Sequence, residues 1–536
     1  MDLAATGRRW AVATPHMAAT RAAAEAFEAG GNALDAALAA AVTLAVVYPQ
    51  ACGVGGDLFA LVARTEQPEI VAINSSGAAP AGVEPDAVRA AHGTMPDRGP
   101  LTVTVPGAVA GWKALCDQGA RFDWGRHFTP AIACAHDGIP VARSLAETLA
   151  ESPELSADAG MAGVFFANGG PLREGDVLRQ PALGATLQTL AAGGPDELYG
   201  GEVGRRYAAG LRAAGSPIAV EDLAAHRAQL VSPLAGRYRE LDVRVVPPNS
   251  QGFVLLEILA AIERLEIDPD PLGPDAAAIA LVVRAARADR DRHLADPRAM
   301  RVHPATLLDD GHLAALCDAV RDGLPASGTG PTPDRIPRRA IPPPDGHHGD
   351  TIALVTADAD GNAVSLIQSL YDGLGSGILE PDTGIVAHSR GAQFVLDPGH
   401  PNVLAPGKRP AHTLMPAMAH RTDRPAVILG TMGGHGQPQI NATNLIRIAE
   451  LGLEPAAAVA APRWLVGGLD EGADWVLAEE DVPRRVRDDL GAAGLPAVTV
   501  PHHSGDVGHA QAIRVLADGT FEVGSDPRAD GGALAW

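Results

Sequence analysis

Lysine is almost absent from this chain, because Lys113 and Lys408 are the only two among 536 residues. A mechanism that needs a lysine Schiff base therefore has few candidates. Positive charge is scarce in general: 64 acidic residues outnumber 42 basic ones, and the formal net charge is −22. Such a surface repels nucleic acid and anionic membranes, so we expect neither as a partner. We attribute the acidity itself to solubility.

Cysteine is also rare, and long apolar runs are missing. The four cysteines, at 52, 116, 134 and 317, show no CxxC spacing, which argues against a zinc knuckle or a redox pair. We expect reduced, buried thiols. The longest apolar run, 36–47, is too short to span a bilayer, and the N-terminus lacks the apolar region of a signal peptide. We therefore expect a cytoplasmic protein.

The residues that are abundant indicate a large folded body. Hydrophobic residues make up 46% of the chain, enough for two or three domains or one large α/β body. An alanine-rich segment, 17–29, predicts a helix that Gly30 and Gly31 end. Asn32 can cap a second helix over 33–47, which is apolar on nearly every side and so should be buried. The glycines at 53–56 lack the GxGxxG spacing of a nucleotide site.

A strand-turn-strand pattern follows a proline-rich segment at 326–344. Residues 351–356 form a short run rich in apolar and β-branched side chains, which is typical of a strand. Asp360, Gly361 and Asn362 are turn residues, and 363–369 reads as the returning strand. The pattern predicts a hairpin whose first strand begins at Thr351, directly after an exposed, cleavable loop.

That position gives Thr351 a possible chemical role. A threonine hydroxyl is a weak nucleophile unless a base lies beside it. If the chain is cut before Thr351, the new α-amino group, with an unperturbed pKa of about 7.7–8.0, lies next to Oγ1. One residue then supplies both nucleophile and base. The alternative is that Thr351 is an ordinary strand residue.

A second candidate feature is the pair Gly433-Gly434, between a predicted strand at 426–431 and a predicted helix at 440–451. Two backbone N–H groups in such a turn can stabilise an oxyanion. The alternative is a simple tight turn. The histidine pairs 347–348 and 502–503 lack acidic or thiol partners at ligand spacing, so we expect neither a metal site nor a cofactor.

Many short motifs, in one order, resemble the γ-glutamyltransferase family of N-terminal-nucleophile hydrolases. They are Gly30-Gly31-Asn32-Ala33 with Asp35-Ala36, Gly53-Val54-Gly55-Gly56, Val105-Pro106-Gly107, Pro130-Ala131-Ile132, Asp350-Thr351, Asp360 to Ser365, Gly375-Ser376-Gly377, Pro406 to Pro410, and Gly433-Gly434. The resemblance implies an α+β fold, a four-layer αββα sandwich formed by two chains cut from one precursor. The fragments would be 1–350, ending in a proline-rich linker at 326–350, and 351–536.

The resemblance also implies the catalytic residues. Thr351 matches the nucleophile, which attacks its own preceding peptide bond, so Asp350-Thr351 is the expected cleavage site. Ser369 matches a hydroxyl residue that hydrogen-bonds the new amino group. Gly433 and Gly434 match the oxyanion hole.

The substrate pocket departs from the family pattern. The arginine that binds the substrate's carboxylate would fall near Ser76, and Ile352 replaces a second threonine. Five further positions match the family's γ-glutamyl contacts, but most carry other residue types: Tyr371, Arg390, Gln393, His412 and Thr413. An arginine cannot accept a hydrogen bond from an ammonium group and repels it.

We therefore expect Arg390, together with His412 and Thr413, to bind a carboxylate or another polar acid. The alternative is that Arg390 points to solvent or pairs with an acidic neighbour. The departures resemble those of the branch that hydrolyses oxamate or the acyl side chains of β-lactams.

Three functions stay open. The first is a self-cleaving amidohydrolase that acts on a small acidic amide and passes the acyl group to water or an amine acceptor. The second is a true γ-glutamyltransferase or glutathione hydrolase, and the third an uncleaved binding or scaffold protein. In the first two the protein would be a heterodimer of its own fragments, with a dimer of these also open.

Overall fold

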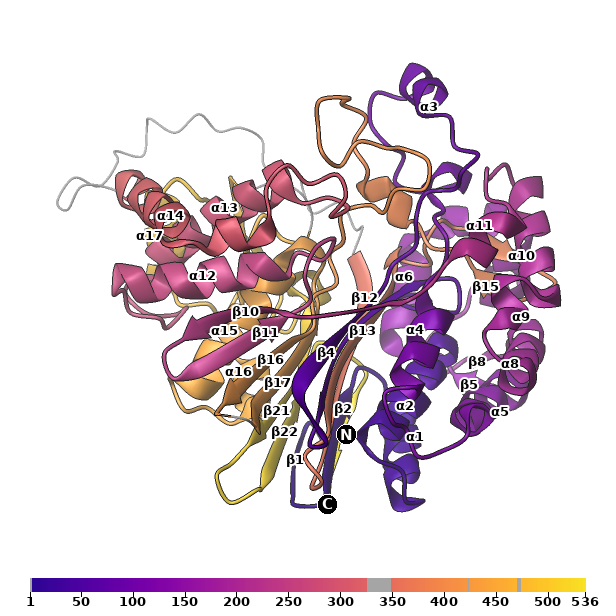
Figure 1. Cartoon of the computed structure of the whole chain (residues 1–536), viewed down its shortest axis with the longest axis horizontal. Coiled ribbons are helices and arrows are strands. Elements are labelled where there is room, and N and C mark those ends of the chain that lie inside the picture. Colours follow the sequence, from indigo (N-terminus) through magenta and orange to yellow (C-terminus); the bar gives the residue numbers. More distant parts are fainter. Residues whose placement is uncertain (1, 325–348, 423, 470–473) are drawn as a thin grey trace.

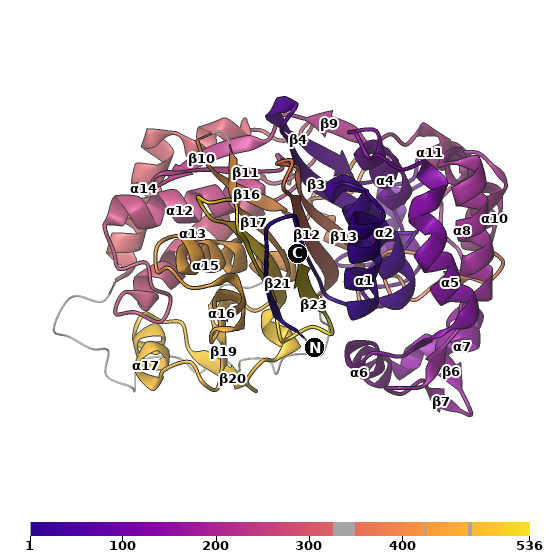
Figure 2. The same ribbon diagram turned by 90° about the horizontal axis from the view of Figure 1, so that it is seen from below.

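The computed structural model describes residues 2–324, 349–422, 424–469 and 474–536. In these ranges, two antiparallel seven-stranded sheets pack face to face, and helices cover the outer face of each (Figures 1 and 2). The arrangement is the α+β, four-layer sandwich that the resemblance implies. The cut into two chains remains a prediction. Of the predicted linker 326–350, residues 326–348 lie outside the described residues.

Thr351 belongs to the second sheet. The first sheet runs in the order β1 (Ala4–Gly7), β22 (Phe521–Ser525), β21 (His509–Val515), β17 (Arg424–Met432), β16 (Ala417–Arg421), β11 (Leu241–Val245) and β10 (Leu234–Tyr238). The second runs in the order β23 (Gly532–Ala535), β2 (Trp10–Thr14), β12 (Gly349–Asp358), β13 (Ala363–Asp372), β3 (Asp57–Arg64), β4 (Gln67–Ser75) and β9 (Gln229–Val231). The predicted hairpin is thus confirmed as β12 and β13.

Each sheet has its own helical cover. Beside the second sheet lie α1 (Met17–Glu28), α2 (Ala33–Val47), α4 (Ala108–Cys116), α5 (Thr129–Asp137), α8 (Pro181–Gly193), α9 (Asp196–Tyr199), α10 (Glu202–Ala213) and α11 (Val220–Ala225). Beside the first lie α12 (Gly252–Leu265), α13 (Ala276–His293), α14 (Asp310–Gly323), α15 (Gln437–Ala449), α16 (Pro455–Ala460) and α17 (Arg484–Ala492). None of the helices in the described ranges has the length and apolar character needed to cross a bilayer.

Short helices and strands lie outside the two sheets and the helices that cover them. They are α3 (Pro85–Ala91), β5 (Ile139–Pro140), α6 (Arg143–Glu151), α7 (Ala159–Phe165), β6 (Phe166–Ala167), β7 (Gly170–Pro171), β8 (Val177–Leu178), β14 (Leu379–Glu380), β15 (Ile385–Val386), β18 (Trp464–Val466), β19 (Val476–Glu479) and β20 (Ala497–Val500). The four cysteines are all free thiols, but only Cys52 and Cys317 are buried as predicted.

The central run of β12, residues 352–355, is apolar because both faces of the strand are buried there. Successive side chains of a strand point to opposite faces. Ile352 and Leu354 pack into the helical layer beside α2, whereas Ala353 and Val355 pack between the two sheets. This double burial explains the continuous apolar run in the sequence, and it places the start of β12 within the packed body.

The junction of α1 and α2 forms as predicted. Gly30 has φ +93°, the left-handed region that favours glycine. The Asn32 side chain accepts hydrogen bonds from the N–H groups of Leu34 and Asp35, and Asp35 completes a capping box. Helix α2 has the predicted bounds and is buried along its whole length.

The two ends of the chain meet at one edge of the sandwich, where Figure 1 shows the N and C labels close together. The backbone N–H of Arg8 donates to the carbonyl of Trp536 at 2.6 Å. Strands β21 and β22 belong to the first sheet, and β23 belongs to the second. None of the three is predicted from the sequence. The C-terminal segment therefore completes both sheets.

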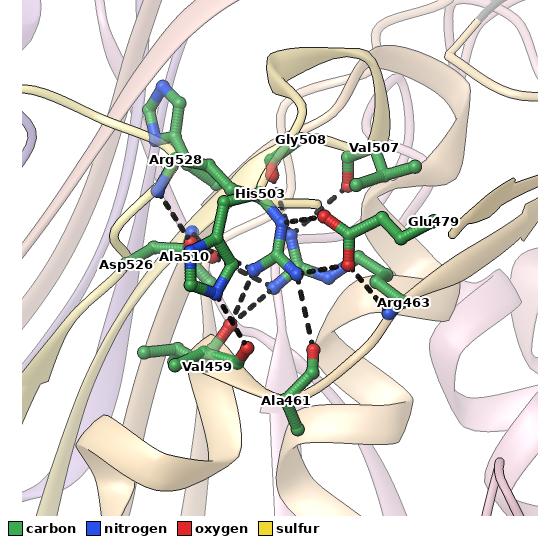
Figure 3. Close-up of polar contacts among 12 residues, drawn as sticks. Val459, Ala461, Arg463, Glu479, His503, Val507, Gly508, Ala510, Asp526 and Arg528 are labelled. Carbon is green, nitrogen blue, oxygen red and sulfur yellow. Dashed lines mark hydrogen bonds and ion pairs between the residues drawn. The ribbon is translucent and has the colours of Figure 1, made fainter. Parts of the chain in front are cut away.

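A buried group of four charged residues fastens this C-terminal region (Figure 3). Arg528 donates to Glu479 and, at 2.9 Å, to Asp526, and Arg463 donates to Asp526 at 2.8 Å. All four side chains are at most 2% exposed. Burial opposes ionisation of Asp526, but the two guanidinium groups outweigh it and lower its pKa to about 2. The group links β19 to the segment between β22 and β23.

Replacing Arg528 with methionine is expected to destabilise the protein by about 3–5 kcal/mol, because two buried carboxylates lose a partner. The free energy of unfolding from urea denaturation measures this effect. Arg484→Met is the matched control, since Arg484 forms an exposed pair with Asp488 and should matter by less than about 1 kcal/mol. Equal losses in the two variants would refute the role of the buried group.

Candidate active site

Thr351 lies near the start of β12 and lines a cleft. Its side chain is 2% exposed, and its Oγ1 donates a hydrogen bond to Oγ of Ser369 on the neighbouring strand β13 at 2.9 Å. The pairing of the two strands shifts register between Asp350 and Ile352, so Thr351 occupies an irregularity in the ladder. Ser369 Oγ also accepts the backbone N–H of Tyr371 at 2.8 Å. These bonds hold the Thr351 hydroxyl in one orientation.

The cleft has a volume of about 730 Å³, and five of the predicted site residues line it. Those that line it are Thr351, Tyr371, Gln393, Thr413 and Gly434. Ser369, Gly433, Arg390 and His412 are not among its lining residues. Segments far apart in the sequence therefore converge on the hydroxyl of Thr351.

Gly433 and Gly434 form the turn between β17 and α15. Their φ angles are +155° and +47°, and a Cβ on Gly434 would lie 2.5 Å from the carbonyl oxygen of Leu469. The carbonyl of Gly433 accepts the N–H of Gly436 at 2.7 Å, which fixes the peptide plane that carries the Gly434 N–H. Within the described residues, neither glycine N–H donates a recorded hydrogen bond. The Gly434 N–H is thus a held donor on a residue that lines the cleft, as an oxyanion site requires.

Arg390 lies behind the cleft wall. It is 1% exposed, its guanidinium lies 4.4 Å from the centre of the Tyr371 ring, and its Nη1 donates to Thr413 Oγ1 at 3.1 Å. Its Nη2 has no hydrogen-bond partner in the described part of the chain. Burial lowers the pKa of Arg390 to about 10, so it stays charged at neutral pH. Arg390 is therefore a buried cation one side chain away from the cleft.

Two other predicted residues have contacts that the sequence does not reveal. Gln393 donates through Nε2 to the hydroxyl of Tyr371. His412 is fully buried and, with Asp57, forms a 3.0 Å contact between Nε2 and the carboxylate. His412 lines a second cavity of about 280 Å³, whose wall shares Gln393, Thr413 and His435 with the main cleft.

Asp57 is a buried residue that sequence reasoning missed. Burial raises its pKa to about 7, and the charge of Arg390 opposes the rise. Its Oδ1 accepts the backbone N–H of Gly77 at 3.0 Å, and His388 lies 3.9 Å from its Oδ2. The sequence signal that could have identified Asp57 is its position between the glycines at 53–56 and the apolar strand β3. Through its contact with His412, Asp57 supports the wall of the second cavity.

Further residues without a sequence prediction line the cleft. Arg89, on α3, lines it, as do Asp97 and His435. Ser76, where the family arginine would fall, is fully buried and donates to Asn74 Oδ1 at 3.0 Å. A substrate carboxylate thus has Arg89 within the cleft and Arg390 behind it as candidate cations.

Buried neutral histidines make the folded protein sensitive to acid. Burial lowers the pKa of His226 and His388 to about 3. It lowers the pKa of His420 and His509 to about 4. Below pH 6.5 these histidines bind protons in the unfolded chain but stay neutral in the folded protein. The free energy of unfolding therefore decreases as pH falls from 6.5 toward 4. Each shift corresponds to on the order of 3 kcal/mol.

We expect the urea midpoint of unfolding to fall steeply between pH 6.5 and pH 5. Asp57 and Glu257 act in the opposite direction, because their raised pKa values, about 7 and about 8, add stability as pH falls. They are outnumbered by the histidines. A midpoint that is constant or rises over this range would contradict the expectation.

Comparison with known proteins agrees with the fold. The family model described as Gamma-glutamyltranspeptidase matches residues 19–536. The oxamate amidohydrolase proenzyme of Klebsiella pneumoniae is 37% identical, with 97% of each chain covered. The glutathione hydrolase-like YwrD proenzyme of Bacillus subtilis is 33% identical over 100% of each chain.

A solved structure extends the likeness to three dimensions. The cephalosporin acylase from Bacillus halodurans superposes with a TM-score of 0.88 at 32% identity, over 99% of this chain and 97% of that chain. The shared fold covers both sheets and both helical layers. The chain therefore belongs to the gamma-glutamyltranspeptidase family and is an enzyme of its hydrolase and acyltransferase kind.

Proposed function

We propose that this protein is an autoprocessing N-terminal-threonine amidohydrolase whose substrate is a small acidic amide. The observation that carries the proposal is the Thr351 hydroxyl in the cleft wall, bonded to Ser369 and facing the same cleft as Gly434. Two similar proteins are named as proenzymes, which supports a maturation cut.

Maturation starts at the peptide bond between residues 350 and 351. Thr351 Oγ1 attacks the carbonyl carbon of Asp350, the C–N bond breaks, and the hydroxyl proton passes to the departing nitrogen. Water then hydrolyses the resulting ester. The products are a carboxylate at 350 and a free α-amino group on Thr351, which Ser369 is placed to hydrogen-bond.

Catalysis repeats the same chemistry on a bound amide. The free amine of Thr351 takes the Oγ1 proton, Oγ1 attacks the substrate carbonyl, and the N–H groups of Gly433 and Gly434 stabilise the oxyanion. The amine of the substrate takes this proton from the α-amino group of Thr351 and leaves. An acyl-threonine ester remains. Water resolves the ester in hydrolysis, and an amine acceptor resolves it in transfer.

The acidic character of the substrate rests on two arginines near the cleft, whose lining also includes Asp97, Asp372 and Asp397. Arg89 lines the cleft, and the unpaired Nη2 of the buried Arg390 lies behind Tyr371. The named activity of the Klebsiella relative, on oxamate, involves an amide that carries a carboxylate. A carboxylate on the substrate would complement these cations.

Replacing Arg390 with methionine is expected to lower kcat/KM for carboxylate-bearing amides by roughly 10- to 100-fold, because a charge-assisted contact is worth about 1.5–3 kcal/mol. A panel of oxamate, neutral amides and glutathione, assayed by product release, measures the change. Arg89→Met is the parallel variant for the other cation. An equal loss on neutral amides, or no loss on any substrate, would reject Arg390 as an anchor.

Two assays separate the remaining functions. Glutamate release from glutathione with no turnover of acidic amides would instead indicate a glutathione hydrolase. Intact-mass analysis that finds only the uncleaved, inactive chain would instead indicate a binding or scaffold protein.

A further inference from the structure

Three helices on the outer face of the first sheet bring a histidine and two carboxylates together. Glu257 lies on α12, Asp289 on α13 and His312 on α14, and the three helices pack against one another (Figure 1). His312 Nε2 lies 2.9 Å from Asp289 Oδ2 and 3.4 Å from Glu257 Oε1. One ligand atom of each residue lies within 4.8 Å of the others, and no other such trio occurs in the described residues.

Glu257 is the unusual member of this trio. Its side chain is fully buried among apolar residues, and neither carboxylate oxygen has a hydrogen-bond partner in the described part of the chain. A buried carboxylate without hydrogen bonds is costly unless a cation compensates it. The carboxylate points toward His312 and shares it with Asp289, which carries a charge of the same sign.

We propose that Glu257, Asp289 and His312 bind a divalent cation of the zinc class. Tetrahedral zinc, with bonds of about 2.0–2.1 Å, separates neighbouring ligand atoms by about 3.3–3.4 Å. The histidine-to-glutamate distance of 3.4 Å matches this value, and the 2.9 Å distance to Asp289 needs only a small shift. Imidazole nitrogen and carboxylate oxygen are both ligand types of such metals.

With a neutral imidazole, two carboxylates and a divalent ion, the net charge of the site is zero. The side chains of His312 and Asp289 are 26% and 13% exposed, so the ion has a route from solvent and a water can take the fourth position.

This site would stabilise the fold and take no part in catalysis. None of the three residues lines the main cleft. Helix α14 ends at Gly323, just before the segment that leads to Thr351. The metal would fasten this last helix of the predicted large fragment to α12 and α13.

The test uses the full-length protein after chelation and dialysis. We expect one equivalent of Co²⁺ to give the visible absorption bands of a tetrahedral site, and one equivalent of Zn²⁺ to abolish them and raise the Tm. His312→Gln should weaken Co²⁺ binding by at least ~100-fold, more than the typical loss for an outer-shell change. His303→Gln is the matched control, because His303 is an exposed residue of the same region.

Asp289→Asn provides a second variant in case His312→Gln unfolds, and its fold is checked by Tm in chelator. Loss of the bands in a folded variant supports the site. Absence of one-to-one binding in the wild-type protein, or equal binding in the wild type and a folded site variant, would overturn it. A wild-type Tm that is the same with Zn²⁺ and with chelator would show that a proton on His312 holds the trio together.

Discussion

Thr351→Ala is expected to purify as a single uncleaved chain of 54.9 kDa with no measurable amidase activity. Both effects have one cause, because the same Oγ1 is the nucleophile for the maturation cut and for the substrate. The uncleaved chain would also lack the free α-amino group that serves as the base. Intact mass and product release from oxamate measure the two outcomes on one preparation.

Two control variants separate chemistry from packing. Thr351→Ser keeps a hydroxyl and should still cleave, more slowly, and retain part of the activity. Thr356→Ala removes a buried hydroxyl from the same strand, where Oγ1 donates to the carbonyl of Ala33 at 2.8 Å. It should cleave and turn over normally if it folds. An active Thr351→Ala protein, or a mature wild-type protein that is never cleaved, would refute the mechanism.

Gly434→Ala is expected to lower kcat by about 10²–10³, the usual effect of losing one oxyanion donor. The added Cβ would lie 2.5 Å from the carbonyl oxygen of Leu469, and φ of +47° is strained for alanine. The turn must shift, and with it the N–H that faces the cleft. The rate is measured on the cleaved fraction, so that a maturation defect does not count as a catalytic one.

Gly436→Ala is the matched control in the same turn. There the nearest neighbour of an added Cβ is a flexible side-chain carbon of Leu465 at 3.2 Å, and φ is −80°. This variant should keep kcat within a few-fold of the wild type. Similar losses at 434 and 436 would mean that the turn responds to any added bulk, and the oxyanion assignment would lose its support.

Local patterns predict the elements whose signals lie within a few residues. Asn32 and Asp35 cap α2 through hydrogen bonds that span at most three residues. The start of this helix can therefore be predicted from the local sequence. The apolar run and the turn at Gly361 likewise predict the hairpin of β12 and β13, although the strands extend to Gly349 and Asp372. Helix α15 begins at Gln437, three residues before the predicted start, because the glycine turn leads directly into it.

Other strands and contacts depend on residues that are far apart in the sequence, so local patterns do not predict them. Strand β21 belongs to the first sheet because it pairs with β17, and β22 pairs with β1 at the edge of that sheet. The burial of Arg390 behind Tyr371 joins residues from different elements. No spacing rule links Asp57 with His412, which are 355 positions apart.

The sequence alone determined the order of the family motifs and, from it, the expected nucleophile, oxyanion glycines and layered fold, because these depend on short motifs in a given order. Only the tertiary structure decided which side chains line the cleft, that Arg390 lies behind it, and that Glu257, Asp289 and His312 meet. The physical reason is that burial and charge depend on which distant segments pack together.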